Sequence, residues 1–255
     1  MLIYFSATGN NQYVAKHLSQ QLNEKSVSMI QLTNNENYEI TLQDNEYLGI
    51  IIPTYFLGLP KYVEEFLSKI NIQTGKNNFV FVISSYGSSP GYSTGYIKEY
   101  LEEQKIHVNA EYSIKMPDTW TPLFDASDKT KIHKTNEEVE IQLKKLINNI
   151  SNKTEGNFTK RKLPKIIANF AQMMYDDKRK TSNFIVEDQC NACGLCVDSC
   201  PINAIAIKDN QIEWVVDRCV LCLRCLHRCP TFAIHYKNRT QNRGQYTNPN
   251  ITKFD

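Results

Sequence analysis

Residues 1–18 read MLIYFSATGNNQYVAKHL, and this stretch decides the fold of the first half of the chain. An apolar run at residues 2–5 is followed by apolar residues four positions apart over 14–22, which predicts a buried strand and then an amphipathic helix. The turn between them, SATGNN, combines hydroxyls, amides and one glycine, and its free N–H groups at a helix start favour an anion such as phosphate. No lysine follows Gly9, as an NTP-binding loop would need, so we expect a phosphate that is held and not hydrolysed.

The remainder of residues 1–150 continues the alternation of strand and helix patterns. Further strands are predicted at residues 27–32, 47–52, 79–84 and 108–114. Helical stripes are predicted at residues 62–70, 96–101 and 139–147. YLGIII and FVFVIS are apolar at successive positions, as in strands that are covered on both faces. The alternation predicts an α/β fold with a doubly wound parallel sheet.

Three of the expected loops carry unusual residues: SATGNN after the first strand, PTYFLGLP after the third and SSYGSSPGYS after the fourth. In a doubly wound sheet with the strand order 2-1-3-4-5, the carboxyl ends of strands 1, 3 and 4 are neighbours, and ligands bind there. Tyr55, Phe56 and Tyr86 offer aromatic faces beside a phosphate loop. Gly58 and Gly87 would let the backbone approach a flat ring closely. A phosphate together with a flat ring indicates FMN.

These loops resemble the flavodoxins, whose phosphate loop reads T/S-x-T-G-x-T, with Asn11 here in place of the last hydroxyl residue. The whole chain resembles flavodoxin–ferredoxin fusions identified as EFR1-family ferredoxins, through PTYFLGLPKYVEEFL and IKMPDTWTP. The resemblance implies a flavodoxin-like, five-stranded parallel sheet in the order 2-1-3-4-5, with Trp120 near the isoalloxazine ring; a merely packed loop aromatic is the alternative for Trp120. The residues expected to bind FMN are Ser6, Ala7, Thr8, Gly9, Asn10, Asn11, Pro53, Thr54, Tyr55, Phe56, Gly58, Ser85, Tyr86, Gly87, Ser88 and Trp120.

All eight cysteines lie in two copies of C-x2-C-x2-C-x3-C-P, 29 positions apart. The copies read DQCNACGLCVDSCPINAIAI (188–207) and DRCVLCLRCLHRCPTFAIHY (217–236). This spacing is typical of bacterial [4Fe–4S] sites, where the fourth cysteine ligates the cluster of the other repeat. Structural zinc is the alternative, but zinc sites use two separated C-x2-C pairs. The spacing therefore predicts two [4Fe–4S] clusters.

Residues 183–238 resemble the bacterial two-[4Fe–4S] ferredoxins, a small α+β fold. The resemblance implies that one cluster is held by Cys190, Cys193, Cys196 and Cys229 and the other by Cys219, Cys222, Cys225 and Cys200. The second copy departs from the first at one position. The glycine after the second cysteine is present as Gly194 but replaced by Leu223.

The expected organisation has four parts: a flavodoxin-like FMN domain (1–151), a basic linker with a short helix (152–182), a ferredoxin domain (183–238) and a polar tail (239–255). The helix is expected from Ile166, Ile167, Phe170, Met173 and Met174. Residues 1–150 carry a net charge of −4 and residues 151–255 a net charge of +6. Two clusters of about −2 each would balance much of the positive charge. The third alternative is a nucleotide-binding regulatory or nucleic-acid module with structural zinc, which rests on the basic connector and the phosphate loop.

The predicted function is electron transfer between two [4Fe–4S] clusters, FMN and redox partner proteins. A ferredoxin-fed reductase of a small molecule, such as a quinone or nitroaromatic, is the alternative. The five histidines are scattered without metal-ligand spacing, and we expect no catalytic triad. The apolar run at residues 2–5 is too short for a signal peptide, so we expect a cytoplasmic protein. We expect no nucleic-acid partner, and no membrane partner because no apolar run is long enough for a membrane span.

Overall fold

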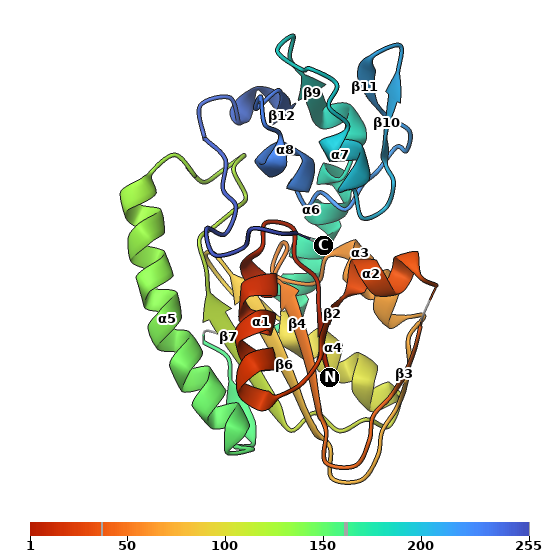
Figure 1. Ribbon diagram of the computed structural model, residues 1–255, viewed down its shortest axis with the longest axis vertical. Coiled ribbons are helices and arrows are strands. Elements are labelled where there is room, and N and C mark those ends of the chain that lie inside the picture. Colours follow the sequence, from red (N-terminus) through yellow and green to blue (C-terminus); the bar gives the residue numbers. More distant parts are fainter. Residues whose placement is uncertain (37, 161–162, 255) are drawn as a thin grey trace.

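The main sheet of the computed structural model has six parallel strands in the order β2-β1-β4-β6-β7-β8 (Figure 1). The structure describes residues 1–36, 38–160 and 163–254. The strands are β1 (Leu2–Tyr4), β2 (Ser26–Ser28), β4 (Tyr47–Pro53), β6 (Phe79–Tyr86), β7 (Ala110–Lys115) and β8 (Gly156–Phe158). Numbered along the chain within this sheet, the strands up to β7 follow the expected order 2-1-3-4-5. The strand β8 adds a sixth from the segment expected to be a linker. A separate parallel pair is formed by β3 (Glu39–Thr41) and β5 (Asn71–Gln73).

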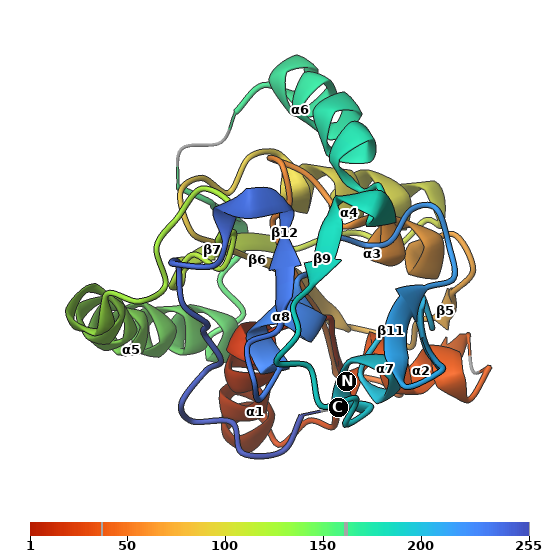
Figure 2. The same ribbon diagram turned by 90° about the horizontal axis from the view of Figure 1, so that it is seen from above.

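Helices cover both faces of this sheet, because successive strand residues point to opposite sides. Ile3 packs in one core with residues of α2 (Met29–Asn34), α3 (Lys61–Leu67) and α4 (Ser93–Glu103). Leu2 packs in the other core with residues of α1 (Asn10–Leu22) and α5 (Lys129–Ser151). Figure 2 shows α1 and α5 on one side of the sheet and α3 and α4 on the other. The arrangement is the predicted doubly wound α/β fold.

The strand expected at residues 27–32 ends at Ser28, so the prediction is wrong for its second half. The Ser28 side chain accepts a hydrogen bond from the Ile30 N–H at 3.2 Å, and Gln31 bonds back to the Ser28 backbone. This capping box starts α2. The short apolar run that follows is compatible with a buried helix and with a buried strand, so its pattern alone does not distinguish them.

The C-terminal part contains two antiparallel ribbons and two short helices. One ribbon pairs β9 (Phe184–Val186) with β12 (Ile234–Tyr236), and the other pairs β10 (Ile205–Lys208) with β11 (Gln211–Trp214). The helices are α7 (Leu195–Asp198) and α8 (Arg224–Arg228); single 3₁₀ turns lie at Thr181–Asn183 and Lys237–Arg239. The helices begin after Gly194 and Leu223, which share the left-handed conformation with φ of 80° and 56°. Leu223 thus keeps the backbone of the glycine that it replaces.

The helix expected in the connector forms as α6 (Lys165–Lys178), but its predicted apolar stripe faces solvent. The exposed side chains are Ile166, Ile167, Phe170, Met173 and Met174. The buried face carries Ala168 and Tyr175 instead. Tyr175 packs against Phe56, so α6 lies against a loop of the first half of the chain (Figure 2).

The polar tail forms an irregular wrap that returns to the first half of the chain (Figure 1). Its residues Tyr246, Asn248 and Ile251 are buried. The Asn248 N–H donates to the Thr8 carbonyl at 2.7 Å, which places the tail directly on the SATGNN turn.

Among the helices that the structure describes, none combines the length and apolar character needed to cross a membrane.

Candidate functional site

A cavity of about 280 Å³ lies beyond the carboxyl ends of β1, β4, β6 and β7. Its wall includes all three loops singled out in the sequence and every residue expected to bind FMN except Gly9 and Gly58. The loop that follows β7 adds Met116, Pro117, Asp118 and Thr119. The three special loops therefore meet at one site, because parallel strands present their loops at the same edge of the sheet.

The SATGNN turn forms the polar end of this cavity. Ser6 and Thr8 are buried hydroxyls in its wall, and Asn10 begins α1, so the first N–H groups of the helix lie beside them. Asn11 Nδ2 donates to the Phe5 carbonyl at 2.8 Å, which ties the start of α1 to the end of β1. Within the described residues the buried Asn11 Oδ1 has no hydrogen-bond partner. The donor set fits a phosphate and its attached chain.

Aromatic side chains form the other end of the cavity. Phe56 and Leu57 adopt left-handed backbone conformations, with φ of 45° and 62°, in a tight turn closed by hydrogen bonds between Tyr55 and Gly58. Phe56 lies 5.3 Å from Trp120, edge to face, and both rings line the cavity. Flat apolar surfaces opposite a phosphate loop fit the ring and the phosphate of FMN.

Gly9 and Gly58 serve contacts outside the cavity. Gly9, with φ of 90°, has Phe254, Asn248 and Ile251 of the tail within 3.3 Å of the place where a Cβ would lie. A Cβ on Gly58 would lie 2.5 Å from the Gln172 side chain of α6. Each glycine thus makes room for a segment from the C-terminal half of the chain.

Asp118 is a half-buried carboxyl in the cavity wall that the sequence did not single out. Its Oδ1 accepts a hydrogen bond from the Trp120 N–H at 2.9 Å. A Cβ on Gly87 would lie 2.1 Å from its Oδ2, so Gly87 provides space for this carboxyl. Burial raises the pKa of Asp118, against the opposing effects of the Trp120 hydrogen bond and of Lys131. The site therefore holds an acid next to the expected flavin position.

The cysteines of the second predicted set line one small cavity together: Cys200, Cys219, Cys222 and Cys225. Burial raises the pKa of the Cys219 thiol to about 11 and that of Cys222 to about 12. Neighbouring thiolates add to both shifts, so these side chains cannot ionise together without a positive partner. An iron–sulfur cluster supplies that positive charge, and the donor set fits one.

In the first predicted set, Cys196 lies near Cys190 and Cys229, which together with its burial raise its pKa to about 11. Cys193 is exposed. The second set thus shares one cavity, and in the first set Cys196 lies near Cys190 and Cys229. Among the described residues, no three His, Cys, Asp or Glu side chains are close enough to hold a single metal ion.

The two cavities share a wall. Leu221, Cys222 and Leu223 line the large cavity as well as the cavity of the second cysteine set. Leu221 and Leu223 both adopt left-handed backbone conformations, which turn this loop onto the first half of the chain. A predicted cluster ligand therefore lies at the wall of the predicted flavin site.

Two protein families match different parts of this chain. The family described as "Flavodoxin domain" matches residues 1–143, more than half of the chain. The chain belongs to the flavodoxin family. A second family, the "4Fe-4S dicluster domain", matches residues 182–243. The predicted fusion is confirmed: the flavodoxin domain has FMN as its cofactor, the dicluster domain with its eight cysteines holds two [4Fe–4S] clusters, and the chain is an electron-transfer flavo-iron–sulfur protein.

Several solved structures are similar to the flavodoxin part. The rubredoxin oxygen:oxidoreductase of the anaerobe Desulfovibrio gigas is 18% identical with a TM-score of 0.35, and the alignment covers 56% of this chain and 35% of that chain. A flavoprotein from Bacteroides uniformis is 14% identical (TM-score 0.32; 46% and 90% covered). A short-chain flavodoxin associated with a non-canonical PDU bacterial microcompartment is 16% identical (TM-score 0.34; 56% and 96% covered). No curated protein matches the chain.

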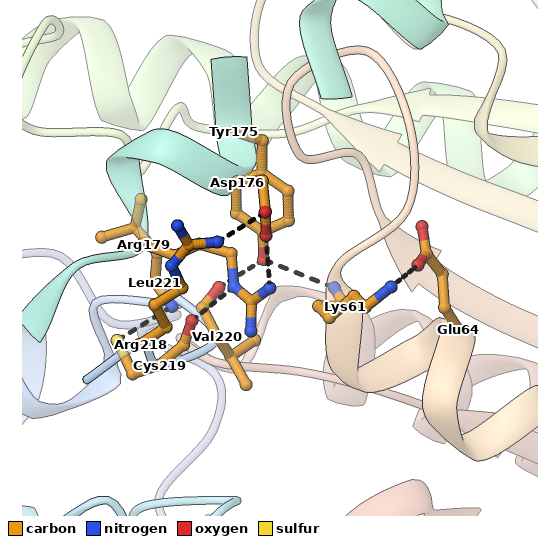
Figure 3. A network of polar contacts seen from close by, with 9 residues as sticks. All are labelled: Lys61, Glu64, Tyr175, Asp176, Arg179, Arg218, Cys219, Val220 and Leu221. Atoms are coloured by element: carbon orange, nitrogen blue, oxygen red, sulfur yellow. Dashed lines mark hydrogen bonds and ion pairs between the residues drawn. The ribbon is translucent and has the colours of Figure 1, made fainter. Parts of the chain in front are cut away.

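Tyr175 of α6 connects the flavodoxin domain to the second cysteine loop (Figure 3). Its hydroxyl donates to the Val220 carbonyl and accepts from the Lys61 N–H at the start of α3. Its ring stacks on Phe56 with centroids 5.2 Å apart. One side chain thus contacts the flavodoxin loop after β4, the helix that follows it and the residue next to Cys219.

Two arginines complete this network (Figure 3). Arg179 Nε donates to the Cys219 carbonyl at 2.7 Å, and its Nη1 bonds Asp176 at 2.8 Å. Arg218 Nη1 bonds the same carboxylate at 2.7 Å. The Leu221 N–H donates to Cys219 Sγ at 3.2 Å. The network holds the cysteine loop against α6 and orients a predicted ligand.

Sequence reasoning missed three features of this site: the role of Asp118 beside Trp120, the position of Leu221–Leu223 between the two cavities, and the contacts of α6 and the tail. The first had a signal, since it follows the fifth predicted strand and contains the shared motif IKMPDTWTP. The other two had none, because they come from parts of the chain that pack here only through tertiary structure.

Proposed function

We propose that the protein passes electrons between its two [4Fe–4S] clusters and its FMN, and exchanges them with redox partner proteins. The observation that carries this proposal is the shared wall: Cys222 lines both the large cavity and the cavity of the second cysteine set. A cluster and a flavin on the two sides of one loop would be close enough for direct electron exchange. When bound, the clusters exchange single electrons and FMN exchanges one or two.

Within this proposal, the SATGNN turn binds the phosphate of FMN and the loops after β4, β6 and β7 enclose its ring. The predicted ligand sets assign Cys200, Cys219, Cys222 and Cys225 to the cluster beside the flavin. Leu221 and Leu223 are buried and exclude water from the path between the two cofactors. The domain boundaries expected from the sequence are part of the proposal, with β8 of the connector added to the flavodoxin sheet.

The remaining cluster, assigned to Cys190, Cys193, Cys196 and Cys229, is the proposed point of exchange with a partner protein. Support comes from exposure: this set contains the exposed Cys193 beside the buried Cys196, whereas every cysteine of the other set is buried or half-buried. Electron transfer falls off with distance, so a partner that docks at the exposed cysteine reaches this cluster first.

Asp118 supports a second function, the reduction of a small molecule such as a quinone. It lines the cavity and its carboxyl has a raised pKa, so it is placed to deliver a proton to a bound acceptor. A small-molecule reductase would reoxidise rapidly with a quinone in single-turnover experiments, whereas an electron carrier would react faster with an oxidised carrier protein.

The cofactors are tested by an anaerobic UV–visible spectrum with chemical quantitation. We expect about eight iron atoms and one FMN per chain. Zinc in place of iron, or protein without flavin absorbance, would overturn the proposal. The order of the cofactors is tested by Cys222→Ala, which should slow reduction of FMN by an external one-electron donor more than Cys193→Ala does.

A further inference from the structure

The families leave two segments of the chain unassigned, residues 144–181 and 244–255. We propose that parts of both, α6 and the C-terminal tail, belong to the FMN site as positioning elements. They hold the two main FMN loops against the second cysteine repeat, so that FMN and the adjacent cluster stabilise each other's binding. The inference rests on the proposed function, because it requires FMN in the large cavity and a cluster on Cys219 and its set.

The connector helix α6 holds the loop after β4 in place through hydrogen bonds. Gln172 Nε2 donates to the Tyr55 carbonyl at 2.6 Å and to the Phe56 carbonyl at 3.1 Å. One turn further along the same helix, Tyr175 donates to the Val220 carbonyl (Figure 3). Arg179 then donates to the Cys219 carbonyl. One rigid helix therefore links the aromatic loop of the flavin cavity to the loop of the cluster.

The C-terminal tail likewise holds the phosphate loop through hydrogen bonds. It contacts the end of α8, where Gln245 Nε2 donates to the carbonyls of Leu226 and Cys229 at 2.7 and 2.8 Å. Three residues later the Asn248 N–H donates to the Thr8 carbonyl at 2.7 Å. The side chain of Asn248 donates to Asn10 Oδ1 at 3.1 Å.

Tyr246 and His227 connect the contact of the tail with α8 to its contact with the phosphate loop. The Tyr246 N–H donates to His227 Nδ1 at 3.2 Å, so the other ring nitrogen carries the proton that bonds the Thr119 carbonyl at 2.8 Å. The Tyr246 hydroxyl donates to Asn10 Oδ1 at 2.9 Å. The α8 helix, the cavity loop after β7 and the phosphate loop are thereby connected through buried groups.

The glycines of the two FMN loops support the same conclusion. Gly9 lies against Asn248, Ile251 and Phe254, and Gly58 lies against Gln172, at distances where a Cβ would press on these side chains. The loops are therefore shaped for the tail and for α6. Because the segments contact both cofactor sites, ordering of one site must favour the other, and this coupling is reciprocal.

The test uses the full-length, cluster-loaded protein and FMN as the probe. Gln172→Ala and Asn248→Ala should each weaken FMN binding, measured by flavin fluorescence, by roughly 3- to 10-fold, as expected for the loss of one or two hydrogen bonds. Asn169→Ala on α6 and Thr252→Ala in the tail are matched controls and should bind as the wild type does. Asn169 bonds Tyr96 away from the cavity, and Thr252 is exposed.

A second readout separates coupling from simple loss of stability. Cluster loss to an iron chelator is followed with and without excess FMN, and FMN should slow one of the two phases in the wild type. In the double variant Gln172→Ala/Asn248→Ala this protection by FMN should disappear, whereas a merely destabilised protein would lose iron faster but keep the protection. If the double variant does not fold, Tyr246→Phe should show the same change on a smaller scale.

Unchanged FMN affinity in the single variants, or undiminished protection by FMN in the double variant, would overturn the inference. Failure of the wild type to bind FMN would instead overturn the proposed function.

Discussion

Leu223 shows how one side chain adapts a ferredoxin repeat to a flavodoxin partner. It occupies the left-handed position of Gly194, at a cost of about 1–2 kcal/mol for a residue with a Cβ. Its side chain is 2% exposed and lines the flavin cavity, where the glycine of the first copy has only open surface and Ile207 nearby. The apolar contact therefore outweighs the backbone strain.

Leu223→Gly is predicted to lower the stability of the cofactor-loaded protein. Removal of a buried leucine costs about 2–5 kcal/mol and relief of the strain returns about 1–2, so a net loss of roughly 0–4 kcal/mol is expected in anaerobic denaturant unfolding. The control Gly194→Leu should be destabilised by the backbone strain alone, by about 1–2 kcal/mol. A Leu223→Gly protein more stable than the wild type would show that strain dominates at this position.

Asp118→Asn is predicted to raise the reduction potential of bound FMN at pH 7. Reduction adds negative charge to the flavin, and the Asp118 carboxylate in the cavity wall opposes it, whereas an amide does not. Because burial raises the pKa of Asp118, its carboxyl takes up a proton at a higher pH than an ordinary aspartate does, and the opposing charge is lost as the pH falls. The potentials of the two proteins should therefore converge as the pH falls, in spectroelectrochemical titrations between pH 7 and 4.5. A constant difference over this range would contradict the assignment.

At the scale of elements, β8 shows how a segment outside the expected domain joins the sheet. Its side chain Asn157 donates to the buried carboxylate of Glu111 on β7 at 3.0 Å. The other carboxylate oxygen accepts from Thr94 of α4 at 2.7 Å. Tyr112 and Phe158 stack across the same pair of strands with centroids 5.1 Å apart. A short strand is thus held by side chains as well as by its ladder.

Glu111→Ala is predicted to destabilise the flavodoxin domain by roughly 2–4 kcal/mol, since it leaves Thr94 and Asn157 without this acceptor. Glu103→Ala, at an exposed position of α4, is the matched control and should leave stability nearly unchanged. Denaturant unfolding followed by circular dichroism measures both. Equal stability of the two variants would show that β8 is held by its backbone pairing alone.

At the scale of the whole molecule, the two cysteine sets differ in their access to solvent. Cys193 is exposed, while Cys219 is buried and Cys222 lines the wall of the large cavity. A chelator or oxidant should therefore remove the cluster assigned to the set of Cys193 first, with a plateau at about four iron atoms per chain. Iron quantitation during anaerobic chelation measures this, and a protein that retains FMN at the plateau would place the surviving cluster beside the flavin. Simultaneous loss of both clusters would contradict the order.

The sequence by itself determined the two folds and their cofactors. Strand–helix alternation with three loops at neighbouring strand ends defines a local pattern, and so does C-x2-C-x2-C-x3-C-P. Such patterns predict structure because neighbouring residues make the relevant contacts. The failed part of the strand at 27–32 fits this view, since Ser28 and Gln31 cap a helix through contacts that apolar spacing does not report.

Only the tertiary structure decided how the two cofactor sites are joined. The wall at Leu223, the position of Asp118 and the outward face of α6 all depend on contacts between residues far apart in the sequence. The same holds for the tail, where Asn248 reaches Asn10 across most of the chain. Composition and periodicity describe the residues of one segment, whereas the energy of such contacts depends on which segment packs against it. That information exists only once the chain has folded.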